Sequence, residues 1–238
     1  MKLVGIGDLY ITSRMILDGL ADLAGQGIEI EAIDWPLKDY QELQTYNHEI
    51  EASGPEAITL PDALIGRVAR ADIIVTHFCP INKYMIHKCS NLKIIGVMRA
   101  GVENISLLEA KERNIAVLNT PGRNAHAVSD FTVGLMMAEC RNIARAHEAL
   151  KHGRWRKDFI NWDFMPELSG KSVGIIGYGA IGQLVARKLR GFGVKIMVYD
   201  PYLNSKRMTR RHEEIFSDLD ALLRGSDFVT IHARLTNE

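Results

Sequence analysis

The sequence predicts an α/β fold made of two doubly wound parallel sheets, each in a domain of its own. At 238 residues the chain is long enough for two domains of ~100–150 residues. Short apolar runs alternate with helical patterns, which is typical of parallel β-α-β units. A glycine-rich turn at residues 177–182 joins one such run to a helical stretch. These three observations together predict this fold class.

The alternation is clearest in the first half of the chain. Gly25 and Gly27 end a helical stretch, and Ser53-Gly54-Pro55 marks a loop further along. We expect strands at residues 3–6, 28–33, 72–76, 92–97 and 115–118, and helices at 13–24, 38–51 and 61–70. This half is therefore predicted to be an open α/β sheet in its own right.

A long helical pattern separates the two halves. It runs from residue 125 to residue 152, and Gly153 ends it. A helix of that length spans ~40 Å and could connect two domains. After it we expect strands at 172–176, 195–199 and 228–232, and helices at 180–190 and 217–224.

Composition excludes several classes of protein. The 29 basic and 29 acidic residues cancel, so no overall field favours nucleic acid or an anionic membrane. The three cysteines, Cys79, Cys89 and Cys140, form no C-x-x-C pair, and no apolar run reaches 18 residues. A strand pattern follows Met1-Lys2 where a signal peptide would begin. We therefore expect a soluble cytoplasmic protein without a metal site.

The glycine-rich turn has the features of a dinucleotide-binding loop. Gly177 permits a tight turn, Gly179 lets the backbone approach a pyrophosphate, and Gly182 lets the helix pack closely on its strand. The helix that starts at Ala180 directs free N–H groups at the phosphates. Asp200, 18 residues after Gly182, ends the next strand and can accept both ribose hydroxyls. A glycine-rich turn in some other doubly wound fold remains the alternative.

A complete fold of this kind has six strands. Counting residues 115–118 as an edge strand, the sequence supplies only three more for this sheet. We therefore expect the C-terminal part of the second domain to lie beyond Glu238.

Five motifs in order resemble the D-isomer-specific 2-hydroxyacid dehydrogenases, and among them the phosphoglycerate-dehydrogenase-like members. They are Arg99-Ala100-Gly101-Val102-Glu103-Asn104-Ile105, Asn119-Thr120-Pro121-Gly122-Arg123-Asn124 with Val128-Ser129-Asp130, the glycine-rich turn, Tyr199-Asp200-Pro201, and His232-Ala233-Arg234-Leu235-Thr236. Arg234 stands where the family usually has proline. The resemblance covers most of the chain.

The resemblance implies an activity and a domain division. It implies a flavodoxin-like substrate domain over residues 1–99 and a Rossmann NAD-binding domain, incomplete, over residues 100–238. The implied reaction transfers a hydride between the nicotinamide of NAD and C2 of a small 2-hydroxy or 2-oxo acid. The family's catalytic Arg, Glu and His would come after Glu238, so no catalytic residue is assigned in this chain.

The resemblance also implies site residues. The candidate substrate-binding residues are His77, Asn82, Arg99, Ala100 and Gly101; a surface loop is the alternative for the first two, and a solvated or ion-paired arginine for Arg99. The candidate cofactor-binding residues are Val128, Gly177, Gly179, Ala180, Ile181, Gly182, Asp200, Pro201, His232, Ala233 and Thr236. Asp200 favours NAD over NADP, because a carboxylate repels a 2′-phosphate. Arg207, Arg210 and Arg211 are interpreted as a solvated face.

Two further expectations come with the family. The long helix at 125–152 would carry a homodimer contact, because its apolar residues exceed what one buried face needs. The alternative function is that of an NAD(H)-sensing binding protein, as in dehydrogenase-like corepressors. Formate and amino-acid dehydrogenases share the layout and also remain open.

Overall fold

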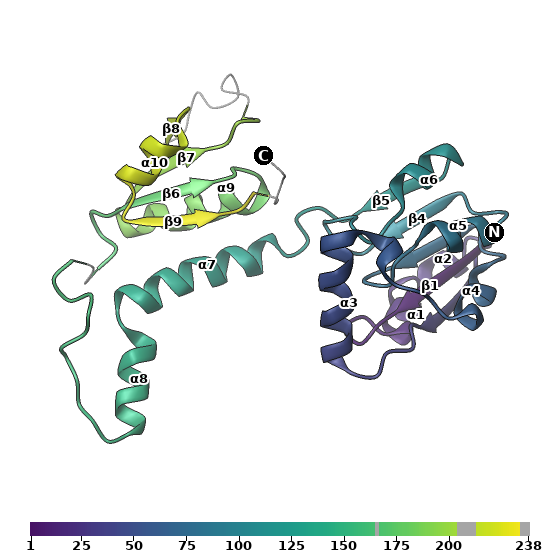
Figure 1. The fold of residues 1–238 in the computed structure, drawn as a ribbon, viewed down its shortest axis with the longest axis horizontal. Helices are drawn as coiled ribbons and strands as arrows, with labels where there is room; N and C mark the ends of the chain where they lie inside the picture. The colour runs from purple at the N-terminus through teal and green to yellow at the C-terminus, as the bar shows by residue number, and fades with distance from the viewer. Residues whose placement is uncertain (165–166, 204–212, 234–238) are drawn as a thin grey trace. The chain divides into compact units, whose positions relative to one another are not determined.

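The computed structural model describes residues 1–164, 167–203 and 213–233. The chain divides into two compact units, Met1–Arg123 and Asn124–Glu238, which are described separately below (Figure 1). Each unit is built around one parallel sheet with helices packed against it. The predicted fold class is thereby confirmed.

Unit 1 contains a five-stranded parallel sheet in the order β2-β1-β3-β4-β5. This is the flavodoxin-like order, in which the direction of winding reverses between β1 and β3. The strands are β1 (Lys2–Gly7), β2 (Glu29–Asp34), β3 (Ile73–Thr76), β4 (Ile94–Val97) and β5 (Ala116–Asn119). The helices are α1 (Ser13–Gly19), α2 (Ala21–Ala24), α3 (Tyr40–Ser53), α4 (Asp62–Val68), α5 (Lys83–Lys88) and α6 (Leu107–Glu112), with a 3₁₀ turn at Pro55–Ala57.

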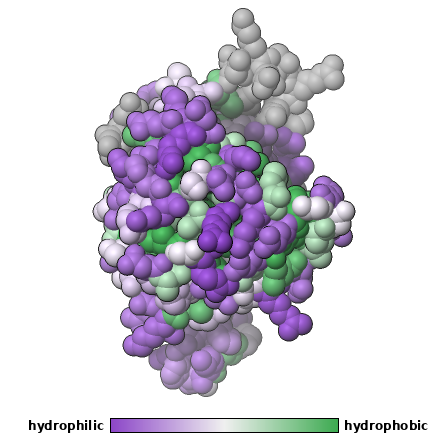
Figure 2. All heavy atoms as spheres, turned by 90° about the vertical axis from the view of Figure 1, so that its right-hand side faces the viewer, coloured by the Kyte–Doolittle hydropathy of each residue, from purple (hydrophilic) through white to green (hydrophobic). Residues whose placement is uncertain are grey.

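The core of unit 1 forms where the strands meet their covering helices. Val4, Ile6, Ile74 and Ile95 are fully buried strand residues. Such continuous apolar strands are expected where helices cover both faces of a parallel sheet. Figure 2 shows one face of the molecule, with mostly hydrophilic residues and smaller hydrophobic areas between them.

Strand β5 places the boundary between the units later than the sequence predicted. Residues 116–119 pair in register with residues 94–97 of β4, so this strand belongs to the first sheet and not to the second. The compact units divide after Arg123, whereas the sequence-based boundary lay between residues 99 and 100. The strand pattern itself could not show which sheet a short apolar run joins.

The long helix predicted over residues 125–152 is wrong as a single element. The structure has α7 (Ala125–Cys140) and α8 (Ile143–Lys151), which run in clearly different directions (Figure 1). Asn142 breaks the helix with a φ of 54°, a left-handed conformation that asparagine tolerates better than most residues. Its buried side chain donates to Oδ1 of Asn161 at 2.6 Å, which holds the corner in place. Gly153, with a φ of 68°, follows the end of α8.

Unit 2 contains a parallel sheet of four described strands in the order β8-β7-β6-β9. They are β6 (Ser172–Ile176), β7 (Lys195–Tyr199), β8 (Glu214–Phe216) and β9 (Phe228–Ile231), with helices α9 (Ala180–Leu189) and α10 (Leu219–Gly225) and a 3₁₀ turn at Arg190–Phe192. Strand β8 was not predicted, because three residues are too few to show a period of two.

Helices α9 and α10 pack on opposite faces of this sheet. A Cβ at Gly174 of β6 would meet Leu222 of α10, and one at Gly182 of α9 would lie 3.3 Å from Ile175 of β6. Adjacent strand residues point to opposite faces, so the two helices cover different sides. Val133 and Met136 of α7 complete the core beneath α9.

Within the described ranges, no helix is long and apolar enough to cross a membrane.

Candidate functional site

Gly177 forms the tight turn at the carboxyl end of β6. Its φ of 87° is a conformation that side-chain-bearing residues rarely adopt. A Cβ there would also lie 2.8 Å from backbone atoms of His232 and Ala233, which follow β9. Both the turn and the close passage of the second chain segment therefore require glycine at this position.

Gly179 and Gly182 are glycines for different physical reasons. A Cβ on Gly182 would overlap the carbonyl oxygen of Gly177, so this glycine lets α9 pack against the turn. Among the residues that the structure describes, a Cβ on Gly179 would meet nothing within 4 Å. Packing against these residues therefore does not explain why residue 179 lacks a side chain, whereas a ligand that approaches the backbone here does.

The N-terminus of α9 faces this open space. Gly179 is the N-cap residue, and no side chain of the described residues caps the helix. The first amides of a helix have no partner inside the helix and carry its positive dipole end. Exposed Ala180 and half-buried Ile181 belong to this first turn. The turn has the chemistry that a pyrophosphate requires.

Asp200 places a carboxylate beside the same turn. Its Oδ2 accepts the backbone N–H of Tyr178 at 2.8 Å, and its Oδ1 accepts that of Tyr202 at 2.9 Å. The backbone N–H of Gly177 donates to Tyr199, the last residue of β7, at 2.9 Å. These bonds fix the acid next to the glycine loop, where it can accept ribose hydroxyls.

The other candidate cofactor-binding residues lie at several places in unit 2. His232 follows β9 and donates its backbone N–H to Ile176 at 2.7 Å, and burial lowers the pKa of its imidazole. Ala233 is exposed beside the Gly177 turn, as is Pro201 beside Asp200. Val128 is half-buried on α7. Thr236, like Arg207, Arg210 and Arg211, lies outside the described residues.

A second group of polar residues lies at the carboxyl edge of the sheet in unit 1. Asp8 follows β1 and His77 follows β3, which are the two strands at the winding reversal. Oδ2 of Asp8 lies 2.9 Å from Nδ1 of His77, and both side chains are almost fully buried. Nε2 of His77 lies 2.9 Å from Nη2 of Arg123, an exposed residue. The three side chains form a chain of contacts from the interior to the surface.

The Asp8 carboxylate is held in its charged form. Burial alone raises its pKa, but hydrogen bonds from His77 and from the amides of Ile11 and Tyr10 outweigh burial and bring the pKa below its ordinary value. Phe78 donates a further backbone N–H to Oδ2 at 3.1 Å. A carboxylate that accepts several donors in this way stays ionised at neutral pH.

Arg99 lies near this group but already has a carboxylate partner. Its Nη2 lies 3.1 Å from Oε1 of Glu51, and its Nη1 donates to Asn47 at 3.1 Å. Its guanidinium also stacks over the ring of Phe78, 4.5 Å from the centroid. The structure thus agrees with the ion-paired alternative for Arg99.

The Ala100-Gly101 segment presents backbone donors. Within the described chain, neither amide N–H has a hydrogen-bond acceptor. Asn119 anchors the segment through a 2.6 Å bond to the carbonyl of Ala100. A Cβ at Gly101 would overlap the carboxylate of Glu103, so the glycine leaves room for that side chain.

Asn82 and Asn104 organise the loop that follows β3. Asn82, a candidate substrate contact, is buried; it caps α5 by accepting the N–H of Met85 at 2.9 Å and donates to Ile58. Asn104 donates to the carbonyls of His77 and Cys79 at 3.2 and 3.3 Å. Both asparagines therefore have structural partners in the protein.

Two members of this polar group in unit 1, Asp8 and Arg123, were not among the predicted site residues. Asp8 directly follows the first strand, and Arg123 follows the last strand of the same sheet by four residues. Because ligands of open α/β sheets bind outside the carboxyl ends of the strands, this placement was the available signal.

The cysteines are thiols without unusual reactivity. Burial raises the pKa of Cys79 well above its ordinary value and that of Cys89 to about 11. Such thiols are protonated at neutral pH, and only the thiolate is a good nucleophile. In the described part of the chain, no three metal-ligating side chains form a cluster that could hold a metal ion.

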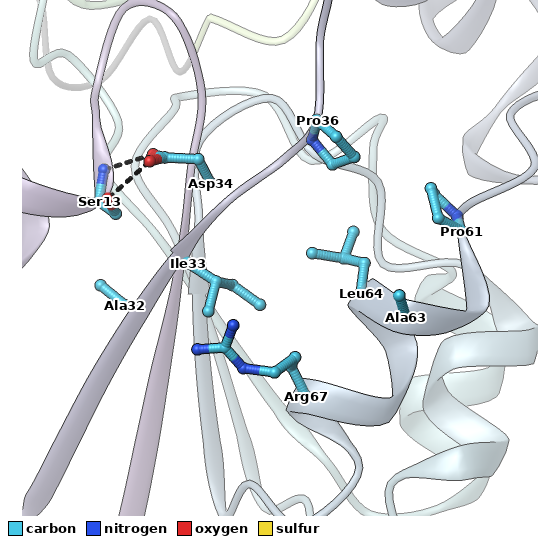
Figure 3. A pocket seen from close by; sticks show the side chains of 9 residues that line it. All are labelled: Ser13, Ala32, Ile33, Asp34, Pro36, Pro61, Ala63, Leu64 and Arg67. Atoms are coloured by element: carbon cyan, nitrogen blue, oxygen red, sulfur yellow. Dashed lines mark hydrogen bonds between the residues drawn. The ribbon is translucent and has the colours of Figure 1, made fainter.

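One open pocket lies at the β2 edge of unit 1 (Figure 3). It has a volume of about 400 Å³ and is lined by residues of β2, α4 and the start of α1, among them Asp34, Leu64 and Arg67. Asp34 accepts both the N–H and the hydroxyl of Ser13, and Arg67 pairs with Glu31. Its charged groups are thus already partnered.

Comparison with known proteins agrees with this geometry. Residues 133–238 match the model of the D-isomer specific 2-hydroxyacid dehydrogenase NAD binding domain. A hydroxypyruvate reductase of Thermotoga maritima is 41% identical over 176 residues, which are 74% of this chain and 55% of that protein. A D-3-phosphoglycerate dehydrogenase of Methanocaldococcus jannaschii is 37% identical over 177 residues, 74% of this chain and 33% of that protein. The chain thus spans about half or less of the length of these two relatives.

A solved structure shares the fold. The NAD-dependent formate dehydrogenase of Staphylococcus aureus in complex with NAD matches 100% of this chain and 66% of its own, with a TM-score of 0.71 and 25% identity.

The fold and the glycine loop define a dinucleotide-binding α/β protein with two doubly wound units. More particularly, the chain belongs to the D-isomer-specific 2-hydroxyacid dehydrogenase family, and unit 2 contains its NAD-binding domain.

Proposed function

We propose that this protein is an NAD-dependent oxidoreductase that interconverts a small 2-hydroxy acid and the corresponding 2-oxo acid. The open space at Gly179, between an uncapped helix N-terminus and the Asp200 carboxylate, is the observation that carries the proposal. None of the residues of unit 2 that the structure describes fills this space, and its donors and acceptor suit a pyrophosphate and a ribose. NAD bound there supplies the hydride acceptor for oxidation at C2.

In this proposal each part of NAD has its own binding residues. The adenosine ribose is held by Asp200, and the pyrophosphate by Gly177, Gly179, Ala180, Ile181 and Gly182. The rest of the cofactor site is formed by Pro201, His232, Ala233, Thr236 and Val128.

The free amides of Ala100 and Gly101 support a carboxylate-binding role for that segment of unit 1. Small residues there allow a ligand to approach the backbone closely. The contacts of His77, Asn82 and Arg99 favour the view that these residues shape the substrate loop instead of touching the acid directly. The names of the relatives, hydroxypyruvate reductase and D-3-phosphoglycerate dehydrogenase, support a small 2-oxo or 2-hydroxy acid as substrate.

The activity is tested by following NADH absorbance at 340 nm with glyoxylate and hydroxypyruvate, using the polypeptide as its gene encodes it. Oxidation of NADH that depends on the 2-oxo acid is the expected result. Tight NADH binding without turnover of any 2-oxo acid would instead favour an NAD(H)-sensing protein.

We expect NAD(H) to bind at least about tenfold tighter than NADP(H). A 2′-phosphate would meet the Asp200 carboxylate, and about 1.4 kcal/mol of repulsion suffices for a tenfold preference. Asp200→Ala should weaken NADH binding and narrow the gap between the two cofactors, both measured by fluorescence titration. Asp227→Ala is the control, because Asp227 accepts the N–H of Ser172 at the start of β6. Equal affinity of the unaltered protein for both cofactors would contradict this prediction.

We also propose a homodimer formed through α7, α8 and the segment that follows them. Large apolar side chains are more than half exposed here: Phe131, Leu135, Ile143, Leu150, Trp155, Ile160, Trp162 and Phe164. Phe131 and Leu135 are four residues apart and share a face of α7. Contiguous exposed apolar surface is typical of subunit interfaces, and a second copy would cover it. A monomer in sedimentation equilibrium at micromolar concentration would overturn the proposal.

A cytoplasmic location completes the proposal. Its support is the presence of three buried free thiols, Cys79, Cys89 and Cys140, with no disulfide among them. Free thiols of this kind suit a reducing compartment.

A further inference from the structure

We propose that Arg123 is an anion-binding residue, positioned by the buried Asp8–His77 pair, that selects acids with a second anionic group. The group is a phosphate or a second carboxylate, in addition to the carboxylate next to the reacting carbon. The identity of the acid rests on the proposed function above, but the anion site stands on the geometry of unit 1 alone.

The hydrogen bonds define the protonation of His77. Nδ1 faces the ionised Asp8 carboxylate at 2.9 Å, so the proton resides on Nδ1. Nε2 then carries a lone pair and accepts a hydrogen bond from Nη2 of Arg123 at 2.9 Å. His77 is therefore a link that contacts a carboxylate through one ring nitrogen and a guanidinium through the other.

This arrangement leaves the positive charge of Arg123 available to bind an anion. A guanidinium has five N–H donors, and His77 takes one of them. In the described residues no carboxylate lies within ion-pair distance of Arg123. Arg99 differs, because Glu51 neutralises it. The remaining fork of Arg123 can bind a planar carboxylate or a phosphate with two parallel hydrogen bonds.

The position in the fold supports a ligand. Asp8 and His77 follow β1 and β3, the neighbouring strands between which the order of the sheet reverses. Ligands of open α/β sheets bind outside the carboxyl ends of the strands at this point. The loop that leads to Arg123 is tied to the substrate segment, since Thr120 donates its backbone N–H to Arg99 at 2.9 Å.

The burial of the pair indicates that its purpose is positioning. The side chains of His77 and Asp8 are 3% and 0% exposed. Removing an ionised carboxylate and an imidazole from water carries a desolvation cost that apolar side chains at these positions would avoid. An arginine that only contacts solvent does not need a buried Asp–His pair to hold its side chain in place. His77 is thus a positioning residue that acts through Arg123, while Arg123 touches the ligand.

The first test is calorimetric titration of the protein with inorganic phosphate and, separately, with malonate, in the absence of NAD. We expect binding of at least one of them, and a loss of at least tenfold in affinity in Arg123→Gln. Arg70→Gln is the matched control: Arg70 is exposed like Arg123 but precedes β3, at the opposite edge of the sheet. The stronger ligand distinguishes a phosphate from a carboxylate. No binding to the unaltered protein, or equal affinity in Arg123→Gln, would overturn the proposal.

A double-mutant cycle tests the positioning role of His77. If His77 acts through Arg123, then His77→Phe weakens anion binding and adds little to the loss already caused by Arg123→Gln. Fully additive losses would contradict that role. Circular dichroism and thermal melting identify any variant that fails to fold, and Arg123→Gln, at an exposed position, remains informative if His77→Phe does not fold.

Turnover provides a second readout. In the unaltered protein, we expect a lower KM for oxaloacetate, which carries two carboxylates, than for pyruvate. Arg123→Gln should raise the KM for oxaloacetate at least tenfold more than the KM for pyruvate. Equal changes for both acids would overturn the selection role. If no 2-oxo acid is reduced at all, the proposed function fails, and the titrations still decide the anion site.

Discussion

Gly179→Ala is expected to weaken NAD binding strongly while leaving the stability of the protein nearly unchanged. The added Cβ would meet none of the described residues within 4 Å, so their packing does not oppose it. The same space is where the backbone must approach the pyrophosphate, and a methyl group there would keep the phosphates away from the N-terminus of α9. We expect a loss of at least tenfold in affinity for NADH by fluorescence titration, with the melting temperature shifted by less than about 2 °C.

Gly182→Ala is the matched variant and should behave differently. Its Cβ would overlap the carbonyl oxygen of Gly177, a backbone atom that cannot rotate away. Overpacking of this kind costs ~1–3 kcal/mol, so the melting temperature should fall by several degrees whether or not NAD is present. If Gly179→Ala destabilised the protein as much as Gly182→Ala, the space beside Gly179 would not be a ligand site.

Asp8→Ala is expected to destabilise unit 1 by ~3–5 kcal/mol, since it removes one partner of a buried pair. The buried His77 and the amides of Tyr10, Ile11 and Phe78 would all lose their acceptor. Chemical denaturation monitored by circular dichroism measures the change. Asp34→Ala is the control, because Asp34 is the last residue of a strand of this sheet but is exposed, and its bonds are to Ser13 alone. A loss at Asp8 no larger than that at Asp34 would contradict the prediction.

The contribution of Asp8 should also depend on pH in a defined direction. The pKa of its carboxyl is lowered in the folded protein, so the folded state binds the proton less tightly than the unfolded state. The stabilisation is therefore fully present above the ordinary carboxyl pKa of about 3.9 and is lost as the pH falls through the lower folded value. The difference in stability between the unaltered protein and Asp8→Ala, measured by chemical denaturation, should therefore shrink as the pH falls below 4.

The nucleotide loop could be predicted from the sequence because its constraints are local. A strand, a turn with glycines at fixed spacing, a helix and an acid after the next strand all lie within residues 172–200. The distinction between Gly179 and Gly182 was also implied by their spacing, and the structure supplies its physical basis: one faces open space and the other faces a carbonyl. The alternation of strands and helices likewise predicted two parallel sheets, since each element is defined by its own apolar period.

Other features depend on contacts between residues far apart in the chain, and only the tertiary structure decided them. The run at residues 116–119 joins the first sheet because its backbone pairs with β4. The helix breaks at Asn142 because a buried bond to Asn161 holds a left-handed residue there. The Asp8–His77–Arg123 group joins side chains separated by 69 and 46 residues. The sequence pattern of a segment determines which of its faces is buried. Which other segment packs against that face is decided only by the order in which the strands pair in the sheet.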